Sequence, residues 1–236
     1  IHIDSNPVDP VAFLASKGVR YGAKPVSGSS VSADGSTLPV VDSTGSNGTK
    51  PSGVPATLTA TDAFGRRINL DHKQLVNAGI IIGVGQKTAG VGSRGIQIAL
   101  MTALQESSLR RYANSSVPES LGYPHEAVGS DNNSLGLMQQ RPPGWGSVKD
   151  LMDPTYNAKA FFGGPTGPNH GSPQGLLDTK GWESMSLGQA AQDVQVSAYP
   201  DAYDKWKPVA ALLMEKVGGI TAPGDPLLSS NPCVAA

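Results

Sequence analysis

The chain has 236 residues, and its 29 glycines and 19 prolines make up about a fifth of it, well above ordinary usage. Its net charge is −1 and only 16% of its residues are charged, which argues against a basic nucleic-acid binder and an acidic solvating tail. The longest nearly apolar run, at 78–85, is far shorter than the roughly 20 residues that span a bilayer. The lone Cys233 cannot form a disulfide within the chain, and four scattered histidines lack metal-ligand spacing. We therefore expect no membrane span, no nucleic-acid partner, no metal and no cofactor.

Composition divides the chain into four parts. Residues 1–24 hold one short candidate helix, at 9–17. Residues 25–63 are dominated by Ser, Gly, Thr, Asp and Pro, and such a segment cannot bury enough apolar surface to offset its ordering entropy, so it is interpreted as an extended linker or arm. Residues 64–217 carry the apolar patterning of a globular domain large enough to bury a core. The tail, 218–236, is loop-like.

The patterning of the 64–217 domain predicts helices. In chain order they are expected at 71–86, 93–110, 153–162, 187–196 and 201–216. Asp71 and Ser186 are suited to cap the first and fourth of them, and Pro208 to kink the last. The second helix is apolar on nearly every face, which is typical of a buried central helix. Residues 134–140, after a turn-rich segment, are the one strand-like piece. The fold class is therefore mainly α (α+β): a helical domain with a small β-hairpin, preceded by an extended Gly/Ser/Pro-rich arm.

The predicted central helix carries a single carboxylate, Glu106, near its end. Burial raises the pKa of a carboxyl group, and the negative end of a helix dipole raises it further. A carboxyl group that keeps its proton near neutral pH is suited to general acid catalysis of glycoside cleavage. The alternative is a surface ion pair between Glu106 and Arg110, four residues on. Both interpretations stay open at this point.

Between 30 and 33 residues after Glu106, the chain reads GLMQ at residues 136–139. An ES pair at a helix end followed by GLMQ in a hairpin resembles the soluble lytic transglycosylase and goose-type lysozyme branch of the lysozyme-like superfamily. Residues 70–206 also resemble a domain common in actinobacterial cell-wall proteins and their phages. The segments that carry this resemblance are LVNAGIIIGVG, IALMTALQESSLR, SLGLMQQRPPGWG, LMDPTYNAKAFF and AAQDVQVSAYPDAYDKW.

The resemblance implies roles for particular residues. Glu106 corresponds to the catalytic acid, which then acts as base, and Ser107 to the polar group that supports it. The hairpin that faces this acid and lines the substrate cleft corresponds to Gly136, Leu137, Met138 and Gln139. In the family, the Gln can hydrogen-bond sugar acetamido groups and the Met offers an apolar surface to a sugar.

The family's third cleft wall commonly carries a Tyr in an A-Y-N motif. The best match is Tyr199, in Ser-Ala-Tyr-Pro at 197–200, where the Asn is absent. Tyr203 is a second candidate. For each of these tyrosines, packing in the core is the alternative.

The number of carboxylates at the site bears on the mechanism. Conventional glycosidases use two, whereas lytic transglycosylases are thought to need one, because the substrate's N-acetyl group assists and the product closes into a 1,6-anhydro ring. Glu119, Glu126 and Asp131 are the candidate second acids. If Asp131, just before the hairpin, positions a water, the enzyme hydrolyses like a lysozyme. Its alternative role is an Asx-turn.

The leading hypothesis is an enzyme: a peptidoglycan lytic transglycosylase or muramidase that degrades the cell wall at the MurNAc–GlcNAc β-1,4 bond. Its partners would be peptidoglycan glycan strands, and its location extracellular or cell wall-associated. The alternative is a structural component of a phage tail (virion) or a secreted assembly, with a lysozyme-like glycan-binding domain of weak or no activity. Residues 1–63 would then contact phage-tail or cell-envelope proteins. A plain wall-binding module is disfavoured, because a buried Glu without a task is costly.

Overall fold

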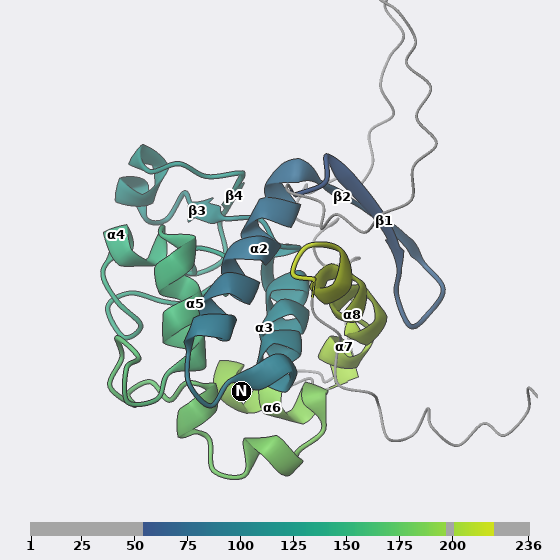
Figure 1. The fold of residues 1–236 in the computed structure, drawn as a ribbon. Coiled ribbons are helices and arrows are strands. Elements are labelled where there is room, and N and C mark those ends of the chain that lie inside the picture. The colour runs from purple at the N-terminus through teal and green to yellow at the C-terminus, as the bar shows by residue number, and fades with distance from the viewer. Residues whose placement is uncertain (1–53, 197–200, 220–236) are drawn as a thin grey trace, which may run out of the picture. The chain divides into compact units, whose positions relative to one another are not determined.

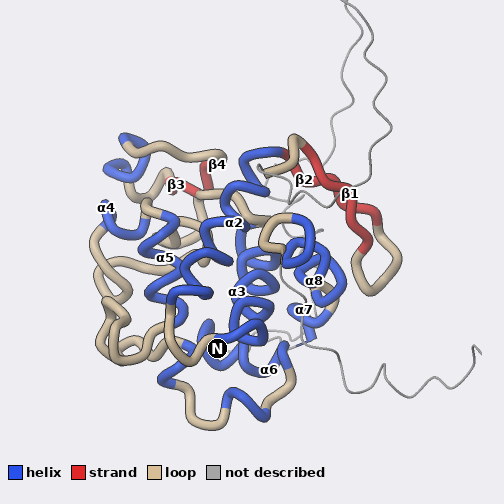
Figure 2. The backbone as a smooth tube through the Cα atoms, in the orientation of Figure 1, coloured by secondary structure: helices blue, strands red, loops and turns tan. Residues whose placement is uncertain are grey.

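The computed structural model describes residues 54–196 and 201–219. Within these ranges the chain is mainly helical, with one small two-stranded antiparallel sheet (Figures 1 and 2). The expected α+β class is thus confirmed at this level. The helix expected at 9–17, the arm as far as residue 53 and the tail from residue 220 lie outside the described residues.

A β-hairpin opens the described part of the chain. Strand β1 (Thr57–Thr61) pairs with β2 (Arg67–Asp71) in an antiparallel register that places Leu58 opposite Leu70. Ala60 and Leu70 are buried in the core, while Thr57, Thr59, Thr61, Arg67 and Asn69 on the two strands are exposed. The strand β1 lies in the range 25–63 that composition assigned to the arm. Its alternation rests on Leu58 and Ala60 between threonines, which is too weak a pattern to stand out in that range.

Two long helices follow the hairpin. Helix α2 (His72–Lys87) begins where predicted, because Asp71 caps it and Gln74 completes a capping box. Helix α3 (Gly92–Ser107) ends three residues before its expected end. The cause is local: Ser108 and Leu109 adopt left-handed φ angles of 52° and 61°, and the Leu109 N–H bonds to the Ala103 carbonyl, which closes the helix.

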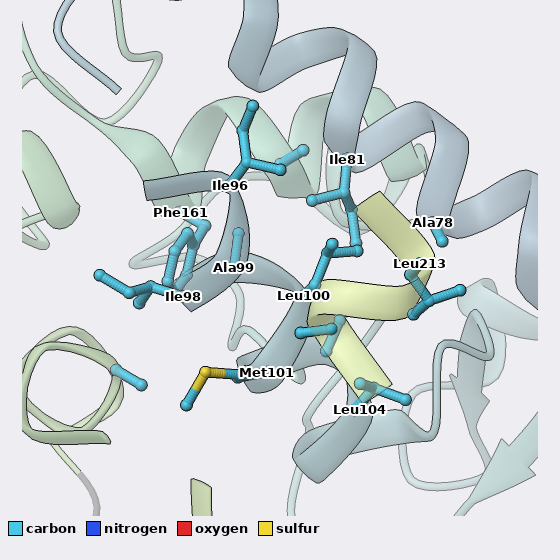
Figure 3. Close-up of a cluster of buried hydrophobic side chains, with 14 of the residues drawn as sticks. Ala78, Ile81, Ile96, Ile98, Ala99, Leu100, Met101, Leu104, Phe161 and Leu213 are labelled. Atoms are coloured by element: carbon cyan, nitrogen blue, oxygen red, sulfur yellow. The ribbon is translucent and has the colours of Figure 1, made fainter. Parts of the chain in front are cut away.

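Helix α3 is buried on nearly every side, as its sequence predicted. It packs against α2, α5 (Pro154–Phe162), α6 (Leu187–Gln195) and α8 (Lys207–Lys216) and lies among them in Figure 1. Figure 3 shows how its side chains interlock with those of its neighbours: Ile96, Ile98, Leu100, Met101 and Leu104 meet Ala78, Ile81, Phe161 and Leu213. All of these are at most 2% exposed, so the position of the end of α3 is firmly determined by packing.

The long segment after α3 has structure of its own. Strands β3 (Tyr112–Asn114) and β4 (Ala127–Gly129) form a short parallel pair, and the 3-10 helix η1 (Pro118–Gly122) lies between them in sequence. A second small core of Ala113, Leu135, Leu151 and Met152 lies behind this segment. It joins the segment to the short helix α4 (Val148–Leu151).

Residues 134–140 form a tight loop instead of the strand-like hairpin that was expected. Leu135 and Gln140 exchange two backbone hydrogen bonds of 2.9 and 3.0 Å, and the four residues between them turn the chain. Gly136 also makes an isolated bridge to Tyr112. The strand-like pattern at 134–140 therefore corresponds to a single hydrogen-bonded pair, Leu135 and Gln140, which is too short to form a β-ladder.

The C-terminal helices complete the domain. Asp153 caps α5 and Ser186 caps α6, as their sequences indicate. The short 3-10 helices η2 (Leu176–Asp178) and η3 (Trp182–Ser184) precede α6. The last predicted helix is divided into α7 (Asp201–Asp204) and α8, and Pro208 lies in the first turn of α8, where it starts a helix and does not kink one. No helix among the described residues combines the length and the apolar character that crossing a membrane requires.

Candidate functional site

Glu106 lies on the last turn of α3 and is partly buried. Burial raises the pKa of its carboxyl group above the ordinary value, and a hydrogen bond that the Tyr203 hydroxyl donates to Oε1, at 2.7 Å, opposes part of that rise. None of the ion pairs among the described residues includes Glu106. The net effect favours the protonated acid at pH values where an exposed Glu is ionised.

The alternative pairing of Glu106 with Arg110 is wrong. The Arg110 guanidinium bonds instead to Asp71, at 2.8 Å, and to the side chain of Gln74, at 3.3 Å. The helix ends at Ser107, so Arg110 no longer follows the helical spacing that would bring it over Glu106. Arg110 therefore ties the end of α3 to the start of α2 and leaves Glu106 to Tyr203.

Tyr203, the second tyrosine candidate, is the one that the structure brings to the acid. It lies on α7 and is 1% exposed, with its hydroxyl directed to Glu106. Tyr199, the first candidate, lies outside the described residues. Sequence reasoning ranked the two by motif, whereas packing of α7 against α3 decides which of the described side chains reaches the carboxyl group.

Ser107 joins the acid's helix to the loop at 136–139. Its hydroxyl lies 2.7 Å from the Leu137 carbonyl and 3.0 Å from the Ala103 carbonyl, and the residue is buried. A single hydroxyl thus positions the loop next to the turn that carries Glu106. The supporting place that the resemblance implies for Ser107 is consistent with these contacts.

The loop itself is packed too closely for most substitutions. Gly136 has a φ of +73°, and a side chain there would meet the Asn157 amide oxygen at 2.0 Å and the Leu151 carbonyl at 2.3 Å. Leu137 and Met138 are both 0% exposed, so in this conformation Met138 offers no side-chain surface to a sugar. Gln139 is partly buried and its amide donates to the Gly136 carbonyl at 3.0 Å.

Two side chains that hold the loop escaped the sequence analysis. Asn157, on α5, accepts from the Leu137 N–H at 2.8 Å and donates to the Gln140 side chain at 2.9 Å. Gln195, at the end of α6, donates to the Met138 carbonyl at 3.1 Å. An amide among the apolar residues of α5 was the available signal for Asn157, because buried polar groups need partners.

The three candidate second acids have other partners. Asp131 is exposed in a bend and accepts from the side chain of its neighbour Asn132 at 3.0 Å, which matches a turn role. Glu119 is exposed and accepts from Tyr123. Glu126 is bound by Arg111 and Asn77. None of these hydrogen bonds reaches Glu106.

Backbone strain gathers around the same site. The described non-glycine residues with positive φ are Ser108, Leu109, Asn132, Gln139, His170 and Val196. Four of the six lie directly after the end of α3 at Ser107, in the 136–139 loop or directly after Gln195. Such conformations cost of order 1 kcal/mol or more each and are typical of functional sites.

No metal site accompanies the acid. Among residues 54–196 and 201–219, no group of three or more His, Cys, Asp or Glu side chains is placed to hold an ion.

Comparison with protein-family models gave no match, and comparison with curated proteins gave none that is significant. The arguments for function therefore come from the residues and their geometry.

Proposed function

We propose that this protein is a peptidoglycan-cleaving lytic transglycosylase of the muramidase type, with Glu106 as general acid and then general base at the MurNAc–GlcNAc β-1,4 bond. The observation that carries the proposal is the environment of Glu106: a partly buried carboxyl group with a raised pKa that, within the described part of the chain, has one neutral hydrogen-bond donor and no cation paired with it. A structural carboxylate would gain from a positive partner. A general acid needs the proton that this environment retains.

The proposed reaction has two steps. The protonated Glu106 gives its proton to the glycosidic oxygen, so the bond from that oxygen to C1 of the MurNAc ring breaks while positive charge develops at C1. The resulting Glu106 carboxylate then takes the proton of the same ring's C6 hydroxyl, whose oxygen bonds to C1. The products are a 1,6-anhydro-MurNAc end and a free GlcNAc 4-hydroxyl, and Glu106 regains its proton.

The absence of a second engaged acid supports the anhydro product. Glu126 and Glu119 take hydrogen bonds elsewhere, and Asp131 makes a local turn contact in the described structure. A hydrolase of the conventional kind would place a second carboxylate opposite the first to activate a water or to attack C1. We therefore favour the intramolecular C6 hydroxyl as nucleophile over a water held by Asp131.

Mass spectrometry of digested cell wall tests the proposal. The protein is expected to release soluble muropeptides that carry anhydro ends, and Glu106→Gln to reduce release about 1,000-fold, since the amide has no acidic proton to give. The matched control is Glu119→Gln, an exposed glutamate whose loss should leave release unchanged. Undiminished release by a folded Glu106→Gln variant would contradict the assignment, and reducing ends would indicate hydrolysis.

The same reaction fixes where the protein would act. Its substrate is peptidoglycan, so we propose that it works in the extracellular space, at the cell wall or as part of a virion that penetrates it. A partner role for residues 1–63 remains a prediction, because those up to residue 53 lie outside the described structure.

A further inference from the structure

The turn between β1 and β2 is held in one conformation by a buried carboxylate. The Asp62 side chain is 1% exposed and accepts hydrogen bonds from the Phe64 N–H, the Arg66 N–H and the Arg66 guanidinium, all at 2.8–2.9 Å. Burial alone would raise the pKa of Asp62, but these hydrogen bonds and the Arg66 charge hold it below its ordinary value. The turn is therefore a preorganised element, since a surface turn needs no buried charge to close.

This turn presents an aromatic ring to solvent. Phe64 is 71% exposed, the most exposed aromatic among the large apolar residues on the described surface, and the Arg66 guanidinium lies 5.5 Å from its ring centre. A lone exposed apolar residue is ordinary on a protein surface. Here the ring stands on a hydrogen-bonded turn beside a cation, and aromatic residues and Arg are both enriched at binding interfaces.

The turn is also tied to the site of Glu106. The Ala63 N–H donates to the Lys205 carbonyl at 2.9 Å, and Lys205 lies two residues after Tyr203, whose hydroxyl bonds to Glu106. Two residues of chain span at most about 7 Å. The described strand β1 also packs against α8, on the side of the domain where Figure 1 shows α7 and α8.

We infer that Phe64 and its turn form an outlying contact for the glycan strand that is cleaved at Glu106, which rests on the function proposed above. The C–H face of a pyranose ring is apolar with slightly positive hydrogens, and the face of an aromatic ring is its electrostatic complement. Arg66 and the exposed Arg67 outnumber the single carboxylate of the turn. Their surplus positive charge suits the carboxylates on the stem peptides of the same polymer.

The test is retention on insoluble peptidoglycan by the full chain carrying Glu106→Gln, so that nothing is cleaved during the measurement. Adding Phe64→Ala is expected to weaken the apparent Kd about tenfold, as the loss of one aromatic anchor does. Phe64→Trp should restore retention. Leu121→Ala is the matched control: Leu121 is 43% exposed on η1, and its loss should change nothing. Helix η1 lies in sequence between β3 and β4, which Figure 1 shows on the other side of α2 from β1 and β2.

The outcomes separate this inference from the proposed function. If the wild type releases muropeptides but Phe64→Ala retains full affinity, the inference falls and the function stands. If the wild type releases nothing but retention still depends on Phe64, the contact stands without the activity. Retention that Leu121→Ala weakens equally, or no retention of the parent chain, overturns the inference. Circular dichroism checks that each variant is folded. We expect the Phe64 variants to fold because the Phe64 side chain is exposed.

Discussion

Glu106 and Glu126 are the same side chain in two opposite environments. The Glu126 side chain is 8% exposed and is bound by the Arg111 N–H and guanidinium, at 2.7 and 3.0 Å, and by Asn77 at 3.3 Å. Among the described residues, one hydrogen-bond donor reaches the Glu106 carboxyl group, the neutral hydroxyl of Tyr203 at 2.7 Å, and no ion pair includes it. Charge compensation makes Glu126 a structural clamp between α2 and the β3–β4 segment. Glu106 has no such charge compensation among the described residues, so its carboxyl group is suited to exchange a proton.

Neutralising each glutamate in turn should have opposite effects on stability, and this is the largest difference we expect between them. Glu126→Gln removes the partner of Arg111, whose side chain is only 19% exposed. We expect it to lower the free energy of unfolding by about 2 kcal/mol, less than for a fully buried pair because Arg111 keeps some access to water. Glu106→Gln should leave that free energy unchanged or raise it at neutral pH, because it removes an uncompensated carboxylate.

Denaturant unfolding of both variants across pH checks this expectation, with the exposed Glu119→Gln as control. The pKa of Glu106 is raised in the folded protein above its value of 4.5 in the absence of interactions. Its contribution to stability is therefore full below that value and is lost as pH rises through the folded pKa. Relative to Glu106→Gln, the wild type should lose stability on going from acid to neutral pH. A stability loss for Glu106→Gln as large as that for Glu126→Gln would erase the distinction.

The next largest expected effect concerns Tyr203, the hydrogen-bond donor that the described structure places on Glu106. Tyr203→Phe removes the hydrogen bond that lowers the pKa of Glu106, so that pKa should rise further. The basic limb of the activity profile, where the acid loses its proton, should then move to higher pH, and the rate should fall about tenfold because the acid is weaker and less firmly oriented. Measuring muropeptide release against pH for the two proteins tests it.

A matched control distinguishes positioning from general loss of packing. Tyr156, on α5, donates a comparable hydrogen bond to the Trp145 carbonyl at 3.0 Å. Tyr156→Phe should cost about 1 kcal/mol of stability without shifting the pH profile. If both variants shift the profile, or neither does, Tyr203 has no specific part in setting the proton affinity of Glu106.

Sequence alone could predict what depends on near neighbours. The caps Asp71 and Ser186 could be predicted because a capping side chain acts within three residues of itself. The burial of α3 could be predicted because nearly every face of the helix is apolar. The strand β1 was missed because its alternation is weak, with Leu58 and Ala60 between threonines. The end of α3 was placed late because a non-glycine residue with positive φ leaves no signal in composition.

The site was predictable only in part, for a related reason. Glu106 stood out as the lone carboxylate in an apolar helix, but its partner Tyr203 lies 97 residues away. The pairing of Arg110 with Asp71 crosses 39 residues, so the local i+4 alternative could not be dismissed without the fold. Asn157 and Gln195 hold backbone carbonyls and amides of the 136–139 loop, contacts that no residue pattern in the loop itself encodes.

The smallest expected effect tests whether strain belongs to the Glu106 region. Val196 ends α6 with φ 52° and ψ 39° and is 89% exposed. A β-branched residue in this conformation is strained, and glycine adopts it freely. Val196→Gly should therefore raise the free energy of unfolding by about 1 kcal/mol. Val128→Gly, in β4 near Glu126, is the control: Val128 is 49% exposed and has no positive φ, so glycine there should cost about 1 kcal/mol.

Muropeptide release must be measured together with the stability of these two variants, because stability alone does not show whether the strain at Val196 serves the reaction. If Val196→Gly is more stable and releases muropeptides more slowly, the strained end of α6 serves the reaction, because Gln195 next to it holds the Met138 carbonyl of the loop that faces Ser107. If it is more stable and equally active, the strain is a cost of packing and has no catalytic use. A loss of stability like that of Val128→Gly would show that Val196 is not strained at all, and the contrast between the two glutamates would then rest on charge compensation alone.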